Sequence, residues 1–225
     1  MTRRPRVVEL VGAPGSGKSS VAAALGELPG VAVVKDHQRR DLPVLAWSAV
    51  TAGQVLWATP PRGVSRLRWI AWLGRCRAAP RIARRRLAAG ARVVVLDQGP
   101  VYTLGRLAES ARRDPAVARW QLAGVAECGR FLDAVIVLDG EPSLLADRLR
   151  SRAKAHQADD LAVDAAVTYL ERERAMSRTI AAAVAAAGAT MVDVDAASPL
   201  ADNIAAVRAV LDTGPAPVAG TGEPA

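Results

Sequence analysis

Residues 12–19 read Gly-Ala-Pro-Gly-Ser-Gly-Lys-Ser, and this stretch constrains the fold of the chain more than any other. The six residues before it form a short stretch that is mostly apolar and rich in valine, as is typical of a buried parallel strand. Residues 19–28, which follow it, are rich in alanine and end at Pro29-Gly30, which predicts a helix and its stop. The order strand, glycine-rich loop, helix predicts the first unit of an α/β domain.

The same eight residues match the pattern G-x-x-x-x-G-K-[ST] at every fixed position. The glycines allow the backbone to curl so that successive amide N–H groups point at one anion, and the helix N-terminus adds partial positive charge. In this pattern Lys18 is expected to reach the β- and γ-phosphates of ATP, and the Ser19 hydroxyl to bind Mg²⁺. The nucleotide-binding residues that the pattern predicts are Gly12, Ala13, Pro14, Gly15, Ser16, Gly17, Lys18, Ser19 and Ser20.

The length and composition fit one globular domain. The chain has 225 residues, of which 51% are hydrophobic and 23% charged, so residues 1–212 are expected to form a single domain. Residues 213–225 are rich in Gly, Pro and Ala and are expected to be disordered. The two cysteines, Cys76 and Cys128, have no metal-binding or redox spacing, and no signal peptide is recognised at the start. These features predict a cytoplasmic protein.

Residues 42–61 form a twenty-residue stretch without a charged side chain, which is long enough to span a membrane. The stretch also contains several prolines and polar residues, among them Pro43, Gln54 and the pair Pro60-Pro61. We therefore interpret it as a helix that covers a pocket, and we expect no membrane association.

The positive charge of the chain is concentrated in one segment. The formal net charge is +8. Between residues 42 and 96 there is no Asp or Glu, and the arginines of this segment are Arg62, Arg66, Arg68, Arg75, Arg77, Arg81, Arg84, Arg85, Arg86 and Arg92. Such a field attracts a phosphorylated substrate, a nucleic acid or an acidic protein surface.

Apolar runs predict further strands at residues 31–36, 91–96, 134–138 and 190–194. Between them the pattern predicts helices at 42–57, 62–90 with a break near Pro80, 101–113, 115–130, 142–154, 161–187 and 198–211. Strands that alternate with helices predict an α/β fold of three layers: a five-stranded parallel sheet with helices on both faces, as in P-loop NTPases. Trp69 and Trp72 are interpreted as core aromatics.

Three carboxylates end predicted strands, at the edge of the sheet where ligands bind in such folds. Asp97 is expected to hold Mg²⁺ directly or through water. Asp139 lies beside a helix start and is interpreted as structural. Asp36 is either a general base for a hydroxyl acceptor or a turn residue, and the sequence leaves both interpretations open.

Residues 145–152 read Leu-Ala-Asp-Arg-Leu-Arg-Ser-Arg, with Arg148 and Arg152 four apart on one helix face. This stretch resembles the L-x-x-R-L-x-x-R segment that leads into the lid of nucleoside monophosphate kinases. Residues 169–176 and 192–196 are similar to the F-F-E-R-V-R helix and the final strand end of thymidylate kinases. The resemblance implies a short helical lid at about 148–160, with Arg148 over the nucleotide base and Arg152 near the phosphates. It is also compatible with a homodimer.

The sequence departs from thymidylate kinases where that family binds its acceptor. Ala13-Pro14 replaces an Asp-Gly pair, Gln98 replaces the Arg that follows the strand-end Asp, and Lys35-Asp36-His37 replaces Arg-Glu-Pro. The resemblance therefore implies the fold and the ATP-binding half, and it does not imply dTMP as acceptor.

Together these features predict an ATP- and Mg²⁺-dependent phosphotransferase with a small, anionic acceptor bound by residues 37–90. The acceptor is a nucleotide, a nucleoside or another hydroxylated metabolite. The expected catalytic residues are Lys18, Asp36, Asp97, Arg148 and Arg152. Two alternatives remain: a P-loop switch or regulatory ATPase, and a nucleic-acid-associated NTPase that uses the basic segment 62–92.

Overall fold

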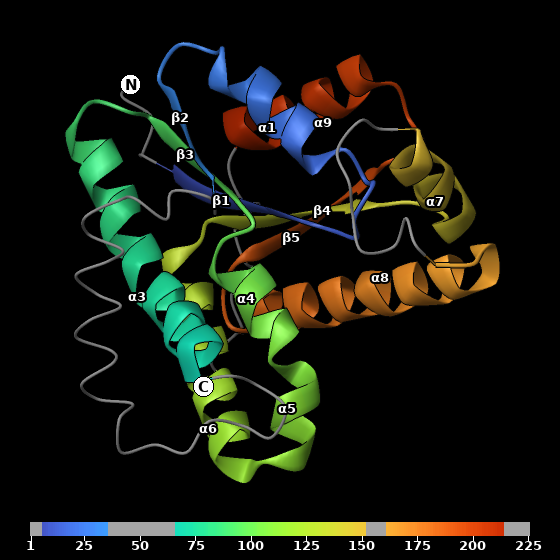
Figure 1. Ribbon diagram of the computed structural model, residues 1–225. Coiled ribbons are helices and arrows are strands. Elements are labelled where there is room, and N and C mark those ends of the chain that lie inside the picture. The colour runs from blue at the N-terminus through green and yellow to red at the C-terminus, as the bar shows by residue number, and fades with distance from the viewer. Residues whose placement is uncertain (1–5, 36–65, 152–160, 214–225) are drawn as a thin grey trace, which may run out of the picture.

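A computed structural model describes residues 6–35, 66–151 and 161–213 of the chain. Its strands form one parallel sheet in the order β2-β3-β1-β4-β5 (Figure 1). The strands are β1 (Arg6–Val11), β2 (Val31–Lys35), β3 (Val93–Asp97), β4 (Ala134–Asp139) and β5 (Thr190–Asp195). The predicted five-stranded parallel sheet is confirmed.

Helices cover both faces of the sheet (Figure 1). Val8 and Leu10 of β1 face one layer, formed by α1 (Lys18–Gly26) and α9 (Leu200–Thr213). Val7 and Val11, which alternate with them, face the opposite layer. That layer contains α3 (Arg66–Ala88), α4 (Pro100–Arg106), α6 (Pro115–Phe131) and α8 (Val163–Ala186). The central strands β1, β3 and β4 are mostly apolar on both sides because each side lies in a core.

The α3 helix differs from the prediction, because it continues through Pro80 without a break. A proline inside a helix removes one hydrogen bond and costs about 3 kcal/mol. Ala79 and Ala83, on either side of Pro80, are buried in the core of the sheet's second face. Packing of these residues outweighs the local cost. Local helix propensity does not include this packing, so the sequence alone predicted a break.

Residues 101–113, predicted as one helix, form the end of α4 and a second helix, α5 (Ala108–Arg113). Leu107 separates the two and is fully buried beside Trp69 and Leu73 of α3. Trp69 is 5% exposed, and its ring lies 5.6 Å from that of Trp120 at an interplanar angle of 61°. The interpretation of Trp69 as a core aromatic is confirmed.

Several predictions lie outside the described residues. These are the helix at 42–57, Asp36, Arg152, and most of the lid and of the tail. Within the described ranges, every helix is too short or too polar to cross a membrane.

Candidate nucleotide-binding site

The glycine-rich loop connects the carboxyl end of β1 to the first turn of α1. Gly15 has a φ of 85°, in the left-handed region that favours glycine. A Cβ atom at this position would lie 2.6 Å from the Leu145 carbonyl oxygen. Gly17 is the N-cap of α1 and has no side chain that could accept from the first helical N–H groups. These backbone amides are therefore left for a ligand in the loop. The loop has the local geometry that an anion cradle requires.

The Lys18 ammonium lies inside this loop, and the residue is only 6% exposed. Its Nζ donates to the carbonyl oxygens of Gly12 and Ala13, each at 2.8 Å, and to the Ser16 hydroxyl at 3.3 Å. A buried ammonium needs such partners. The carbonyl contacts hold a positive charge at the centre of the loop, where a phosphate would be bound.

Ser19 and Asp97 face each other across the sheet edge. The Ser19 hydroxyl donates to Asp97 Oδ2 at 3.2 Å. Asp97 is 7% exposed, and its other oxygen, Oδ1, is buried without a hydrogen-bond partner among the described residues. A hydroxyl beside a carboxylate with an unused oxygen matches the oxygen ligands that Mg²⁺ prefers.

Among the described residues no cluster of three or more His, Cys, Asp or Glu side chains could hold a metal ion. Mg²⁺ is commonly bound by one or two protein oxygens together with substrate phosphates and waters. The pair Ser19 and Asp97 therefore fits Mg²⁺ that is bound together with a nucleotide, and it does not fit a metal held by the protein alone.

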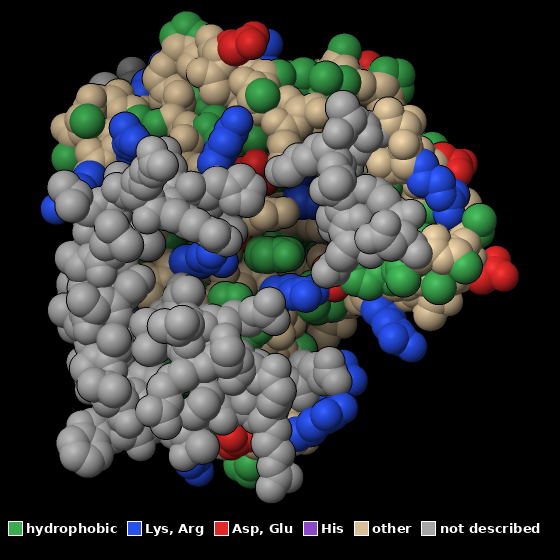
Figure 2. Space-filling model, viewed as in Figure 1, with side chains coloured by type: hydrophobic (Ala, Val, Ile, Leu, Met, Phe, Trp, Pro, Cys, Tyr) green, Lys and Arg blue, Asp and Glu red, His purple; other side chains and the backbone are tan. Residues whose placement is uncertain are grey.

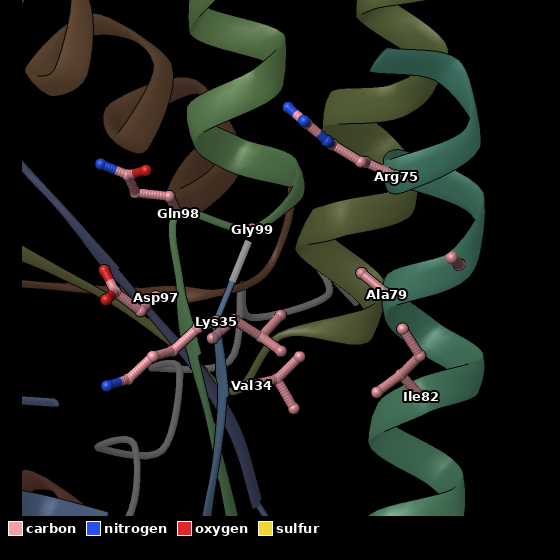
Figure 3. A pocket seen from close by; sticks show the side chains of 10 residues that line it. Val34, Lys35, Arg75, Ala79, Ile82, Asp97, Gln98 and Gly99 are labelled. Carbon is pink, nitrogen blue, oxygen red and sulfur yellow. The ribbon is translucent and has the colours of Figure 1, made fainter. Parts of the chain in front are cut away.

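A small pocket of about 50 Å³ lies beside Asp97, between the ends of β2 and β3 and the helix α3 (Figure 3). One side of the pocket is apolar, with Val34 opposite Ala79 and Ile82. The polar side chains of the lining are Lys35, Arg75, Asp97 and Gln98. In Figure 3 the Lys35 side chain extends to the same side of β3 as Asp97. The Arg75 guanidinium points from α3 toward Gln98.

Basic side chains are prominent on the same face of the molecule. Figure 2 shows Lys and Arg side chains around a central hollow on this face. Arg75 and Lys35 belong to the pocket lining, and Lys18 lies in the adjoining loop. A pocket with this lining is suited to a ligand with an apolar part and a negative charge.

Arg148 lies on α7 (Pro142–Arg150), as the spacing of its neighbours predicted. Its guanidinium donates to the Ala196 carbonyl oxygen at 2.6 Å, directly after β5. Ala196 shares a hydrophobic cluster with Ala13 of the glycine-rich loop and Leu145 of α7. The structure thus brings Arg148 to the same edge of the sheet as the loop, whereas Arg152 lies outside the described residues.

Asp139 is part of an ion-pair network at the end of β4. Arg174 of α8 donates to both of its oxygens, at 2.6 and 3.1 Å, and Arg178 donates to Oδ2 at 2.9 Å. Burial acts to raise the pKa of Asp139, but the hydrogen bonds and charges of the two arginines outweigh it and hold the pKa below its usual value. These contacts agree with the structural role expected for Asp139.

Sequence reasoning missed two buried carboxylates, Glu9 and Glu173. Glu9 is fully buried in β1, and Glu173 is 7% exposed on α8, where it forms an ion pair with Arg106 of α4. The signal for Glu9 was present in the sequence as a charged residue within an apolar strand. For Glu173 the sequence offered no such contrast, because it lies in the charged run 171–174.

The comparisons with known proteins agree with this geometry. The family model described as "AAA domain" matches residues 7–177. Deoxyadenosine kinase from M. mycoides with bound dCTP has a similar structure, with a TM-score of 0.57 and 12% sequence identity over 92% of this chain and 99% of that one. The same enzyme with bound dATP gives a TM-score of 0.53, at 12% identity over 92% and 100% of the two chains. No curated protein sequence matches significantly. The chain therefore belongs to this AAA domain family and has the P-loop kinase fold of deoxyadenosine kinase.

Proposed function

We propose that the protein is an ATP-dependent phosphotransferase that moves the γ-phosphoryl group to a small, anionic acceptor. One observation carries the proposal: the Lys18 loop, the Ser19–Asp97 pair and a pocket with an apolar wall and cationic side chains adjoin one another at one sheet edge. A loop alone would suit any nucleotide-binding protein, and the adjoining pocket is what favours transfer to a second substrate.

On the donor side, backbone amides of the loop and the α1 N-terminus bind the phosphates. When phosphates enter the loop, Lys18 exchanges its contacts with Gly12 and Ala13 for phosphate oxygens. Bound Mg²⁺ would neutralise charge on the β- and γ-phosphates. Ser19 and Asp97 are the residues of this chain that would hold it.

On the acceptor side, the pocket beside Asp97 binds part of the acceptor, since its volume of about 50 Å³ is well below that of a site for a whole nucleotide. Lys35 and Arg75 attract the negative charge of the acceptor, and Val34, Ala79 and Ile82 contact its apolar part. The similar solved structures are those of a deoxyadenosine kinase, so nucleosides and nucleotides are the first classes to test, and of these the nucleotides carry the negative charge that Lys35 and Arg75 would attract. Asp36 follows β2 directly and is proposed as the general base if the acceptor group is a hydroxyl.

The lid at residues 148–160 completes the proposal. Arg148 adjoins the loop after β5 through Ala196, a position from which a guanidinium can stack on the donor base. Arg152 follows four residues later in the sequence and is proposed to contact the transferred phosphoryl group.

The test is a screen of nucleosides, nucleoside monophosphates and phosphorylated sugars for acceptor-dependent consumption of ATP. Lys18→Ala should abolish turnover and weaken ATP binding, because the positive charge inside the loop is lost. Arg84→Ala is a matched control, since Arg84 lies on an exposed face of α3 and should leave both unchanged. Wild-type turnover by Lys18→Ala would refute the proposal.

The screen also separates the alternatives. ATP hydrolysis that no small acceptor stimulates would support a switch or regulatory ATPase. Retention of RNA at low salt, lost as salt is raised, would support the nucleic-acid-associated NTPase.

A further inference from the structure

Glu9 is a carboxylate in the middle of the central strand of the sheet. It is 0% exposed, and it points to the same face as Val7 and Val11, whose neighbours are apolar. A carboxylate at such a position is costly unless hydrogen bonds compensate for the lost water. An aliphatic residue would fill the position without this cost, so the contacts of Glu9 need an explanation.

Both carboxylate oxygens of Glu9 accept backbone hydrogen bonds from the first turn of α4. Val101 N–H donates to Oε2 and Tyr102 N–H donates to Oε1, each at 3.0 Å. The N-cap residue of α4 is Gly99, which makes no side-chain cap. Glu9 therefore caps α4 from a different element of the fold, and its negative charge lies at the positive end of the helix.

The turn between β3 and α4 is formed around this contact. A Cβ atom at Gly99 would lie 2.8 Å from Glu9 Oε2, so the carboxylate occupies the space that a side chain would need. Gln98, the preceding residue, has a φ of 61°, which is unfavourable for a residue with a side chain. Such a conformation persists only where surrounding contacts enforce it. Glu9 supplies two of those contacts.

Asp97 is the last residue of β3, immediately before this turn. Glu9 is in register with Leu96 and Leu10 with Asp97, so β1 runs directly alongside the end of β3. We propose that Glu9 is a positioning residue: by fixing the start of α4 it fixes the strained turn, and thereby the direction of the Asp97 carboxylate toward Ser19 and Mg²⁺. This inference rests on the proposed function, because it assigns Asp97 to the metal.

The test is the variant Glu9→Gln. Glutamine is similar in size but has one acceptor oxygen, and its NH₂ group would face one of the two helix N–H donors. Binding of a non-hydrolysable ATP analogue is measured by calorimetry without Mg²⁺ and then across a Mg²⁺ titration. We expect the Mg²⁺ concentration for half-saturation to rise by about tenfold, as for other residues that orient a metal ligand, while binding without Mg²⁺ stays within about twofold.

Asp114→Ala is the matched control. Asp114 caps α6 by accepting from Ala116 N–H at 2.9 Å, so this variant also removes a helix cap, on a different helix. It should lower the melting temperature and leave the Mg²⁺ half-saturation unchanged. If Glu9→Gln does not fold, Gly99→Ala provides the second variant, since its Cβ presses on the same carboxylate.

Three results decide between the possibilities. Folded Glu9→Gln with the Mg²⁺ half-saturation of the wild type would overturn the inference and leave the proposed function intact. An equal shift in Asp114→Ala would also overturn it, because loss of any helix cap would then suffice. A wild-type protein that binds nucleotide without any effect of Mg²⁺ would overturn both the inference and the metal-dependent part of the proposed function.

Discussion

Replacing Asp97 by Asn should raise the stability of the ligand-free protein and weaken its function. The substitution keeps the size of the side chain and an acceptor oxygen for the Ser19 hydroxyl, which lies 3.2 Å from Oδ2. It removes the negative charge of the carboxylate. The second oxygen of that carboxylate, Oδ1, is buried without a hydrogen-bond partner among the described residues. The ligand-free protein should therefore become slightly more stable, while binding of Mg²⁺ with nucleotide is lost.

The magnitude follows from these contacts. A buried acceptor without a partner costs about 1–3 kcal/mol. The amide nitrogen of Asn would also be poorly paired, so the expected gain in the free energy of unfolding is at the lower end, about 1 kcal/mol. For a chain of this length that corresponds to a rise in melting temperature of about 2–4 °C. A ligand at one hundred times its Kd adds about 2.7 kcal/mol to the wild type, or about 5–10 °C.

The assay is thermal unfolding of both proteins without ligand, with an ATP analogue, and with the analogue plus Mg²⁺. The matched control is Asp133→Ala, which removes the acceptor oxygen altogether. The Asp133 carboxylate accepts from Val7 N–H at 2.7 Å, so this variant loses a good hydrogen bond. It should melt at a lower temperature than the wild type and keep the full shift with Mg²⁺.

Two results would refute the reasoning for Asp97→Asn. A ligand-free melting temperature several degrees below that of the wild type would mean that Oδ1 is well satisfied in solution. An undiminished shift with Mg²⁺ would mean that Asp97 does not hold the metal.

Three further predictions concern single positions. Gly15→Ala should abolish nucleotide binding in a direct titration, because its φ of 85° and the nearby carbonyl leave no room for a Cβ atom. Asp139→Asn should lower the urea midpoint at pH 7, and its difference from the wild type should shrink as the pH falls below about 4. The pKa of Asp139 is lowered in the folded state, so its stabilising contribution is complete above the unfolded pKa of about 3.9 and disappears as pH falls through the folded pKa. Burial raises the pKa of the Cys128 thiol far above the usual range, so Cys128 should not react with a thiol reagent at pH 8 until the protein unfolds; rapid labelling of Cys128 in the native protein would contradict this.

The sequence by itself determined the parts of the protein that depend on neighbouring residues. The loop at residues 12–19 could be recognised because its glycines, lysine and serine act within one strand-to-helix turn. The strands could be recognised from continuous apolar runs, and Asp97 from its place at the end of one of them. The parallel sheet followed from the alternation of strands and helices.

The tertiary structure decided the parts in which distant residues meet. Glu9 caps a helix 92 positions away, and Arg148 binds a carbonyl 48 positions away. Neither partner is visible in a local pattern. Helix α3 continues through Pro80 because its flanking alanines pack in the core, which local propensity cannot indicate. Local chemistry therefore specified the phosphate loop, whereas the placement of Asp97 depends on long-range packing and on a buried carboxylate in the central strand.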